Sequence, residues 1–225
     1  MLFRSKFLMK RTFNLVIILL ISSQLRAQSG SVYYLFFKVD QELTDYFKEE
    51  DKARTWFLGW SEGEAMPEEL IDSMKLKTEE RFSAKLAMPV KCCYRKNRKG
   101  ENISSVGVFG VLEGLPANSF NQAKETCAGS TRYISLTVQL YSSGGSSVTI
   151  VDTRSKLKPK IQLTAIVYNE NKEEVWKKDV VLKDFEKLRS VTKYYGTVEV
   201  TRSQVLNPYD IYAMYLMGID RLMED

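Results

Sequence analysis

Histidine is absent from all 225 residues of this chain. Ser-His-Asp and Cys-His catalysis both pass a proton through a histidine ring, and histidine nitrogen is a standard ligand for zinc. Histidine is also the side chain whose ordinary pKa lies between pH 5 and 8. The sequence therefore excludes histidine-based catalysis, histidine-ligated zinc and histidine pH switching.

Cysteine is scarce, with only Cys92, Cys93 and Cys127. The three lack the Cys-x-x-Cys spacing of zinc sites and redox motifs, so we predict no metal site. Gly107, Gly110 and Gly114 are not spaced as a dinucleotide fingerprint or a P-loop, and we predict no cofactor. In an oxidising compartment either Cys92 or Cys93 is expected to pair with Cys127. Such a bond closes a loop of about 35 residues and stabilises the fold by roughly 3–4 kcal/mol. The remaining thiol is either buried and inert or exposed and reactive.

The apolar run nearest the N-terminus, Leu15–Ile21, is too short to cross a membrane, which takes about 20 apolar residues. Four basic residues precede it, and a polar stretch ending in Ala27 follows it. This order is typical of a secretory signal peptide. We therefore predict a signal peptide at 1–27, cut near Ala27-Gln28. The mature chain, 28–225, is expected to be periplasmic or secreted and to have no transmembrane span.

All of the excess positive charge lies in this N-terminal segment. The chain carries 33 basic and 28 acidic residues, a net charge of +5. Residues 1–27 contain five of the basic residues and no acidic ones, so the predicted mature chain is neutral. A neutral chain lacks the overall basic character of nucleic-acid-binding proteins, and we predict no nucleic-acid partner.

One basic cluster remains in the mature chain and is predicted to be a loop between strands that ends at Gly100. Two interpretations are open: a binding patch for an acidic envelope protein or acidic surface polymer, and an ordinary solvated turn. Its members are Lys91, Arg95, Lys96, Arg98 and Lys99.

Alternating apolar and polar residues predict the strands. The alternation runs over 133–141 and again over 161–167, where a turn at 169–173 leads into 175–182 and predicts an antiparallel hairpin. Between these runs, Ser142–Ser147 contains two glycines and is predicted to be a flexible loop. Further strands are predicted at 32–39, 55–60, 90–94 and 106–112.

Two helices are predicted from their end signals. Pro67 begins a helix that extends to about residue 87, and Asn207 with Pro208 begins another that extends to about residue 223. A short helix is expected at 120–127. We therefore predict a single α+β domain, with a mainly antiparallel sheet flanked by two principal helices at about 67–87 and 208–223.

An enzyme without histidine would need another base. Ser190 and Lys193 have the Ser-x-x-Lys spacing that places a hydroxyl and an amine one helical turn apart. However, the residues that follow favour a strand, and the companion Lys-Thr-Gly and Ser-Asp-Asn motifs are missing. A periplasmic hydrolase using Ser190 and Lys193, or a thiol enzyme using Cys92 or Cys93, therefore stays an alternative, and we assign no catalytic residue.

The order of elements resembles that of small envelope domains of Gram-negative bacteria. The residues that carry this resemblance are the 68–86 helix, the 161–168 and 175–182 hairpin with Glu174-Val175-Trp176 near its turn, and the 208–223 helix. The chain resembles periplasmic or outer-membrane-associated domains of unknown function from Bacteroidota and, more distantly, the α/β fold of curli-secretion components. The resemblance implies an envelope protein. With no catalytic constellation in view, we expect a non-enzymatic protein-binding or assembly module.

Overall fold

The computed structural model describes residues 28–40, 43, 66–103, 114–148, 152–195, 197–201 and 206–224. The predicted signal peptide and the strands predicted at 55–60 and 106–112 lie outside these residues.

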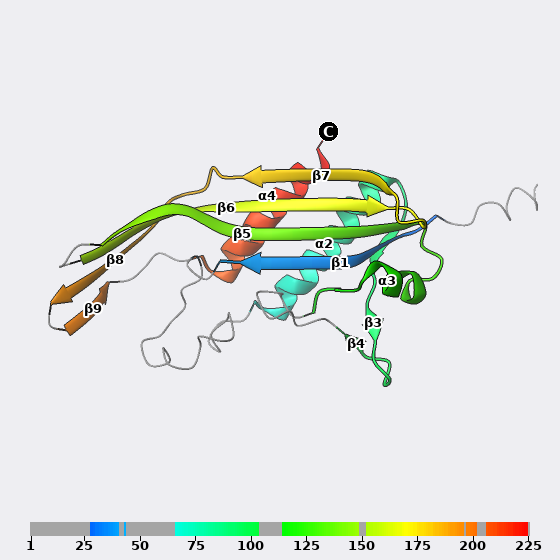
Figure 1. The fold of residues 1–225 in the computed structure, drawn as a ribbon, viewed down its shortest axis with the longest axis horizontal. Helices are drawn as coiled ribbons and strands as arrows, with labels where there is room; N and C mark the ends of the chain where they lie inside the picture. Colours follow the sequence, from blue (N-terminus) through cyan, green and yellow to red (C-terminus); the bar gives the residue numbers. More distant parts are fainter. Residues whose placement is uncertain are drawn as a thin grey trace, which may run out of the picture.

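A mixed β-sheet forms the centre of the fold, with strand order β2-β1-β5-β6-β8-β9 and with β7 beside β8 on the same edge of β6 (Figure 1). β1 runs parallel to β2 and β5, and the remaining pairs are antiparallel. The prediction of an α+β fold with a mainly antiparallel sheet is confirmed. The strands are β1 (Gly30–Val39), β2 (Val90–Cys92), β5 (Arg132–Val148), β6 (Asp152–Tyr168), β7 (Glu174–Leu182), β8 (Leu188–Tyr195) and β9 (Thr197–Thr201).

The two predicted helices are present, and both lie behind the sheet in Figure 1. α2 spans Glu68–Leu86 and connects the parallel strands β1 and β2, which require a crossover of this kind. α4 spans Pro208–Met223 and starts with a capping box, in which Asn207 Oδ1 accepts from the backbone N–H of Asp210 at 2.9 Å. The helix termini therefore lie where the local sequence signals predict them.

The core fills the space between the sheet and these two helices. Alternate residues of β5 and β6 point into it, and so does the apolar stripe of α4. The methionine-containing stripe is thus a core face. Its buried members are Ile211, Met214, Tyr215, Gly218, Ile219 and Leu222.

A second, smaller core lies under the short helix α3 (Phe120–Thr126). It forms because β1 has a bulge between Val32 and Tyr34, where the register with β5 shifts. Tyr33 consequently leaves the main core, and its ring meets that of Phe120 edge to face at 6.0 Å. A single apolar strand therefore supplies both cores.

The prediction of a flexible loop at Ser142–Ser147 is wrong. β5 continues to Val148 and pairs residue by residue with β6 as far as Thr153. Serine and glycine have low strand propensity, but the backbone hydrogen bonds to β6 outweigh it. The other edge of β6 changes partner from β7 to β8 near Pro159, which has no N–H to offer to a further strand.

Candidate functional site

Most of the predicted basic cluster lies on a small hairpin that projects away from the sheet (Figure 1). The hairpin consists of β3 (Arg95–Lys96) and β4 (Asn102–Ile103), which pair antiparallel. Arg98 and Lys99 lie in the turn that joins the two strands. All four basic side chains are exposed, and none forms an ion pair with any residue that the structure describes.

The turn of this hairpin is held by Asn97, which sequence reasoning did not single out. Asn97 Oδ1 accepts from the backbone N–H groups of Lys99 at 2.8 Å and Glu101 at 3.0 Å. Its Nδ2 donates to Glu101 Oε2 at 2.7 Å, and Gly100 takes the left-handed φ of 81° that closes the turn. The exposed side chains of Arg98 and Lys99 at the tip therefore project from a turn whose backbone is fixed by hydrogen bonds.

A second turn of the chain has the same hydrogen bonds, and comparing the two turns shows which sequence pattern they share. Asn169 Oδ1 accepts from the N–H groups of Asn171 and Glu173, both at 2.9 Å, and Asn169 Nδ2 donates to the Glu173 carboxylate at 2.6 Å. Lys172 takes the place of Gly100, with φ of 65°. The shared pattern is Asn and Glu four residues apart, with a left-handed residue just before Glu.

The base of the hairpin is fixed by a disulfide between Cys93 and Cys127, whose Cα atoms are 6.1 Å apart. Cys93 N–H also donates to Val32 O of β1 at 2.9 Å, and its carbonyl accepts from Asn118 Nδ2 at 2.9 Å. Beside it, the Tyr94 hydroxyl donates to a backbone carbonyl at 3.1 Å. The structure thus confirms the predicted disulfide and identifies Cys93, of the two alternatives, as the partner of Cys127.

Lys91, the fifth predicted basic residue, is separate from the other four. It lies in β2, and its Nζ forms an ion pair with Glu79 Oε2 of α2 at 2.7 Å. The hydrogen bond and charge of Glu79 raise the pKa of Lys91. Glu79 Oε1 also accepts from the backbone N–H of Cys92 at 2.7 Å. Lys91 therefore helps to hold β2 against α2, and its charge is compensated within the fold.

Cys92 is the free cysteine, and its partly buried side chain packs against the main core. Burial raises the pKa of its thiol to about 12, and the carboxylate of Glu79 adds to the effect. At neutral pH the thiol is therefore protonated, whereas a nucleophilic cysteine needs its thiolate. Because Cys93 and Cys127 are bonded to each other, none of the three cysteines offers an activated thiolate.

Ser190 and Lys193 lie in β8, where they pair with Ser155 and Asp152 of β6. The Ser-x-x-Lys spacing brings its two side chains together in a helix. Because β8 is a strand, the helix that this spacing requires is not formed at Ser190 and Lys193.

Within the described part of the chain there is no cluster of three or more histidine, cysteine, aspartate or glutamate residues that could hold a metal ion. Among the helices described, none is long and apolar enough to cross a membrane.

No family model matches the chain, and no curated protein matches it. Among solved structures, the chain is similar to one described as a neuraminyllactose-binding hemagglutinin homologue from Helicobacter pylori. The two share 7% sequence identity with a TM-score of 0.36, and the alignment covers 88% of this chain and 79% of the other.

Proposed function

We propose that this protein is a non-enzymatic binding protein of the bacterial cell envelope, and that the β3–β4 hairpin contacts an acidic surface on a partner protein. One observation carries the proposal. Four cationic side chains lie on one projecting hairpin, exposed and without an ion-pair partner among the described residues. They are Arg95, Lys96, Arg98 and Lys99.

The fixed geometry of the hairpin favours a specific contact. A surface that is already ordered loses little conformational entropy on binding. Here the Cys93–Cys127 disulfide holds the base, and the Asn97–Glu101 hydrogen bonds hold the tip. Clustered cations also accelerate encounter with an acidic surface, in a way that salt screens.

A protein partner is favoured over a uniformly acidic polymer because the hairpin is not uniformly basic. Glu101 lies beside the cations at the tip, and its backbone pairs with that of Asn97. Charges of both signs at fixed positions select one alignment of two proteins, because an acidic group of the partner placed opposite Glu101 is disfavoured. The envelope location is supported by the signal-peptide pattern at 1–27 and by the disulfide, a bond typical of oxidising compartments.

The test is capture of partners from envelope extract with the full mature chain and two charge-reversal variants. In the first variant, Lys96, Arg98 and Lys99 become glutamate. In the matched control, three exposed lysines elsewhere become glutamate, which gives the same net charge: Lys124, Lys183 and Lys187.

We expect the hairpin variant to lose a protein that the wild type and the control both capture, and we expect added salt to release that protein. Equal capture by both variants, or equal loss, overturns the proposal. Capture that survives proteolysis of the extract assigns the site to an acidic polymer instead.

A further inference from the structure

β7 (Glu174–Leu182) is a long edge strand that pairs regularly with β6 from Trp176 to Leu182 and has a bulge at Val175, where the register shifts. It pairs with β6 on one side, and no other strand pairs with it in the described part of the chain. Figure 1 shows it along one border of the sheet, far from the β3–β4 hairpin. Edge strands of this kind are usually shortened, bulged or interrupted by proline, because their free N–H and C=O groups recruit other strands. β7 has nine residues and no proline or glycine, and its bulge at Val175 leaves the seven residues from Trp176 to Leu182 as a regular edge.

We propose that two copies of this chain associate through β7, paired antiparallel around a two-fold axis at Lys178. The partner is a second copy because the sequence of β7 complements itself. In this register Val175 faces Val181 of the other copy, and Lys177 faces Asp179, each contact occurring twice. The result is one continuous sheet across two chains.

The exposed face of β7 supports this register. Val175 and Val181 are 47% and 46% exposed, so both apolar side chains are available for contact with another chain. Lys177 and Asp179 lie between them on the same face, because alternate strand residues share a face. Directly opposed apolar pairs and opposite charges are the contacts that stabilise neighbouring strands.

The carboxylate of Asp179 is held on the exposed face of the sheet by two side chains of β6. Its Oδ1 accepts from Thr164 Oγ1 at 2.9 Å, and Gln162 Nε2 lies 3.1 Å from both carboxylate oxygens. An ionised carboxylate has about four acceptor positions, so capacity is left for a lysine of a second copy. The carboxylate can therefore keep its bonds to β6 while it accepts from Lys177 of the second copy.

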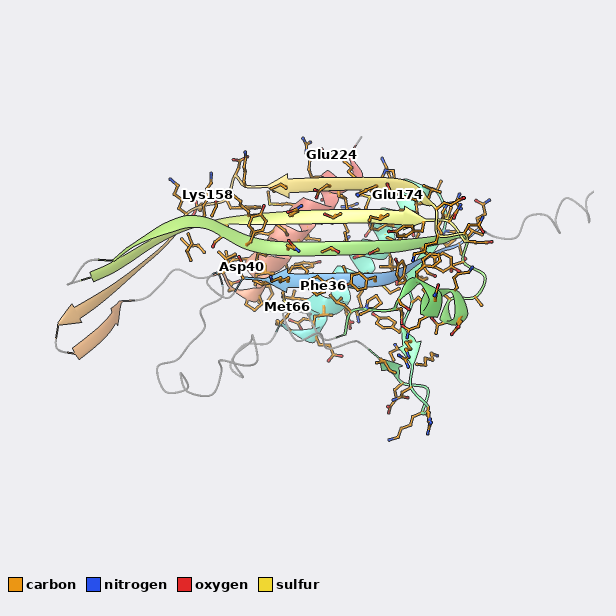
Figure 2. The ribbon with its side chains drawn as sticks, viewed as in Figure 1. Phe36, Asp40, Met66, Lys158, Glu174 and Glu224 are labelled. Atoms are coloured by element: carbon orange, nitrogen blue, oxygen red, sulfur yellow. A yellow bond between two sulfur atoms is a disulfide. The ribbon has the colours of Figure 1, made fainter. Side chains whose placement is uncertain are left out.

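Lys178 lies on the two-fold axis and therefore faces Lys178 of the second copy. A contact within each chain reduces the repulsion between these two ammonium groups. Lys178 Nζ donates to the carbonyl oxygen of Glu224, just past α4. Figure 2 labels Glu224 next to the outer border of β7. The ammonium group is thus held toward the end of its own chain.

Neighbouring registers are disfavoured. Antiparallel pairing alternates between hydrogen-bonded and non-hydrogen-bonded pairs, so moving the axis by one residue gives the next allowed register. Moving it to Lys177 places that lysine opposite itself, and moving it to Asp179 places that carboxylate opposite itself. Both shifts also separate Val175 from Val181. The pattern of β7 therefore selects the axis at Lys178.

The experiment measures the mass of the full mature chain by sedimentation over the micromolar range. We expect the wild type to form dimers as concentration rises. Lys177→Glu and Asp179→Lys are each expected to abolish the dimer, because each places like charges opposite one another. Lys124→Glu is the control, since this exposed lysine lies in α3 and outside the β7 edge.

Mixing the two monomeric variants tests the register itself. The Lys177→Glu chain offers two carboxylates and the Asp179→Lys chain two ammonium groups, so an equimolar mixture is expected to restore a dimer of one chain of each kind. A wild type that stays monomeric, a dimer that survives either single change, or a mixture that stays monomeric overturns the proposal. The β3–β4 hairpin is unchanged in all of these variants. Capture of a partner through the hairpin and dimerisation through β7 can therefore fail or succeed independently.

Discussion

The hydroxyl groups of Thr78 and Tyr215 meet in the core, where they join the two long helices. Thr78 Oγ1 lies 2.5 Å from the Tyr215 hydroxyl, and both side chains are fully buried. Thr78 also donates to Met74 O at 2.7 Å within α2. Since that bond uses its single hydrogen, Thr78 accepts from Tyr215. The buried hydroxyl of Tyr215 therefore has a hydrogen-bond partner. Burial also raises the pKa of Tyr215.

This pair should contribute a measurable coupling energy. Thr78→Val and Tyr215→Phe are each expected to lower the free energy of unfolding by roughly 1–3 kcal/mol, since each removes one partner of a buried hydrogen bond. The double variant should lose clearly less than the sum, because neither group is then left without its partner. Urea denaturation of the four proteins measures the coupling, and additive losses would contradict it.

Gly218 of α4 lies close against a side chain of the sheet. A Cβ atom added there would lie 2.3 Å from Leu163 Cδ1 of β6. Gly218→Ala is therefore expected to cost about 1–3 kcal/mol through overpacking, although alanine is the better helix former. Thermal unfolding measures this. Combining it with Leu163→Ala should cost less than the two losses added together, and exposed Met217→Ala in the same helix serves as control.

The Cys93–Cys127 disulfide should stabilise the whole domain. Replacing both cysteines with alanine is expected to lower the free energy of unfolding by roughly 2–5 kcal/mol, and reducing agent should act similarly on the wild type. Cys92→Ala is the matched control, since Cys92 is not in the disulfide and its change should cost less. A Cys92→Ala loss as large as that of the double variant would show that the bond itself contributes little.

The thiol of Cys92 should be unreactive in the folded protein. Its raised pKa of about 12 leaves almost no thiolate at neutral pH, and its side chain is partly buried. Unreduced protein is expected to resist thiol reagents while native and to react at one thiol per chain when denatured. Rapid labelling of the native protein would instead favour the thiol-enzyme alternative.

The protein should lose stability in alkali. The ordinary pKa of cysteine is 9.0, and that of Cys92 in the fold is about 12. Between these values the unfolded chain gives up a proton that the folded chain keeps, so rising pH favours unfolding. The stabilisation is complete below about pH 9 and is lost toward pH 12. Tyr33, whose pKa is raised from 10.0 to about 12 by burial, acts in the same direction.

Chemical denaturation at a series of pH values measures this effect. Cys92→Ala should flatten the fall in stability that begins near pH 9, while leaving the part that begins near pH 10. A free energy of unfolding that does not change between pH 9 and 12 would contradict the environments of both side chains.

Local patterns in the sequence were sufficient for several elements. The two-residue alternation over 133–141 and 161–167 is a property of each strand by itself, and it places their apolar residues on one face. The start of α4 follows from neighbours in sequence, since Asn207 and Asp210 cap each other. The run of charges ending at Gly100 predicts a loop, and the turn does lie at Arg98–Gly100, whereas the pairing of β3 with β4 is not predicted by it. These features depend on contacts within a few residues.

The tertiary structure decided what depends on distant partners. Adjacent Cys92 and Cys93 look equivalent in the sequence, but pairing of β2 with β1 turns Cys93 toward Cys127 and Cys92 toward the main core. The Ser142–Ser147 stretch becomes strand because β6 supplies its hydrogen bonds. Thr78 stands in a polar run, and only the packing of α4 against α2 buries it beside a tyrosine 137 residues away. In each case long-range contacts outweigh the local preference.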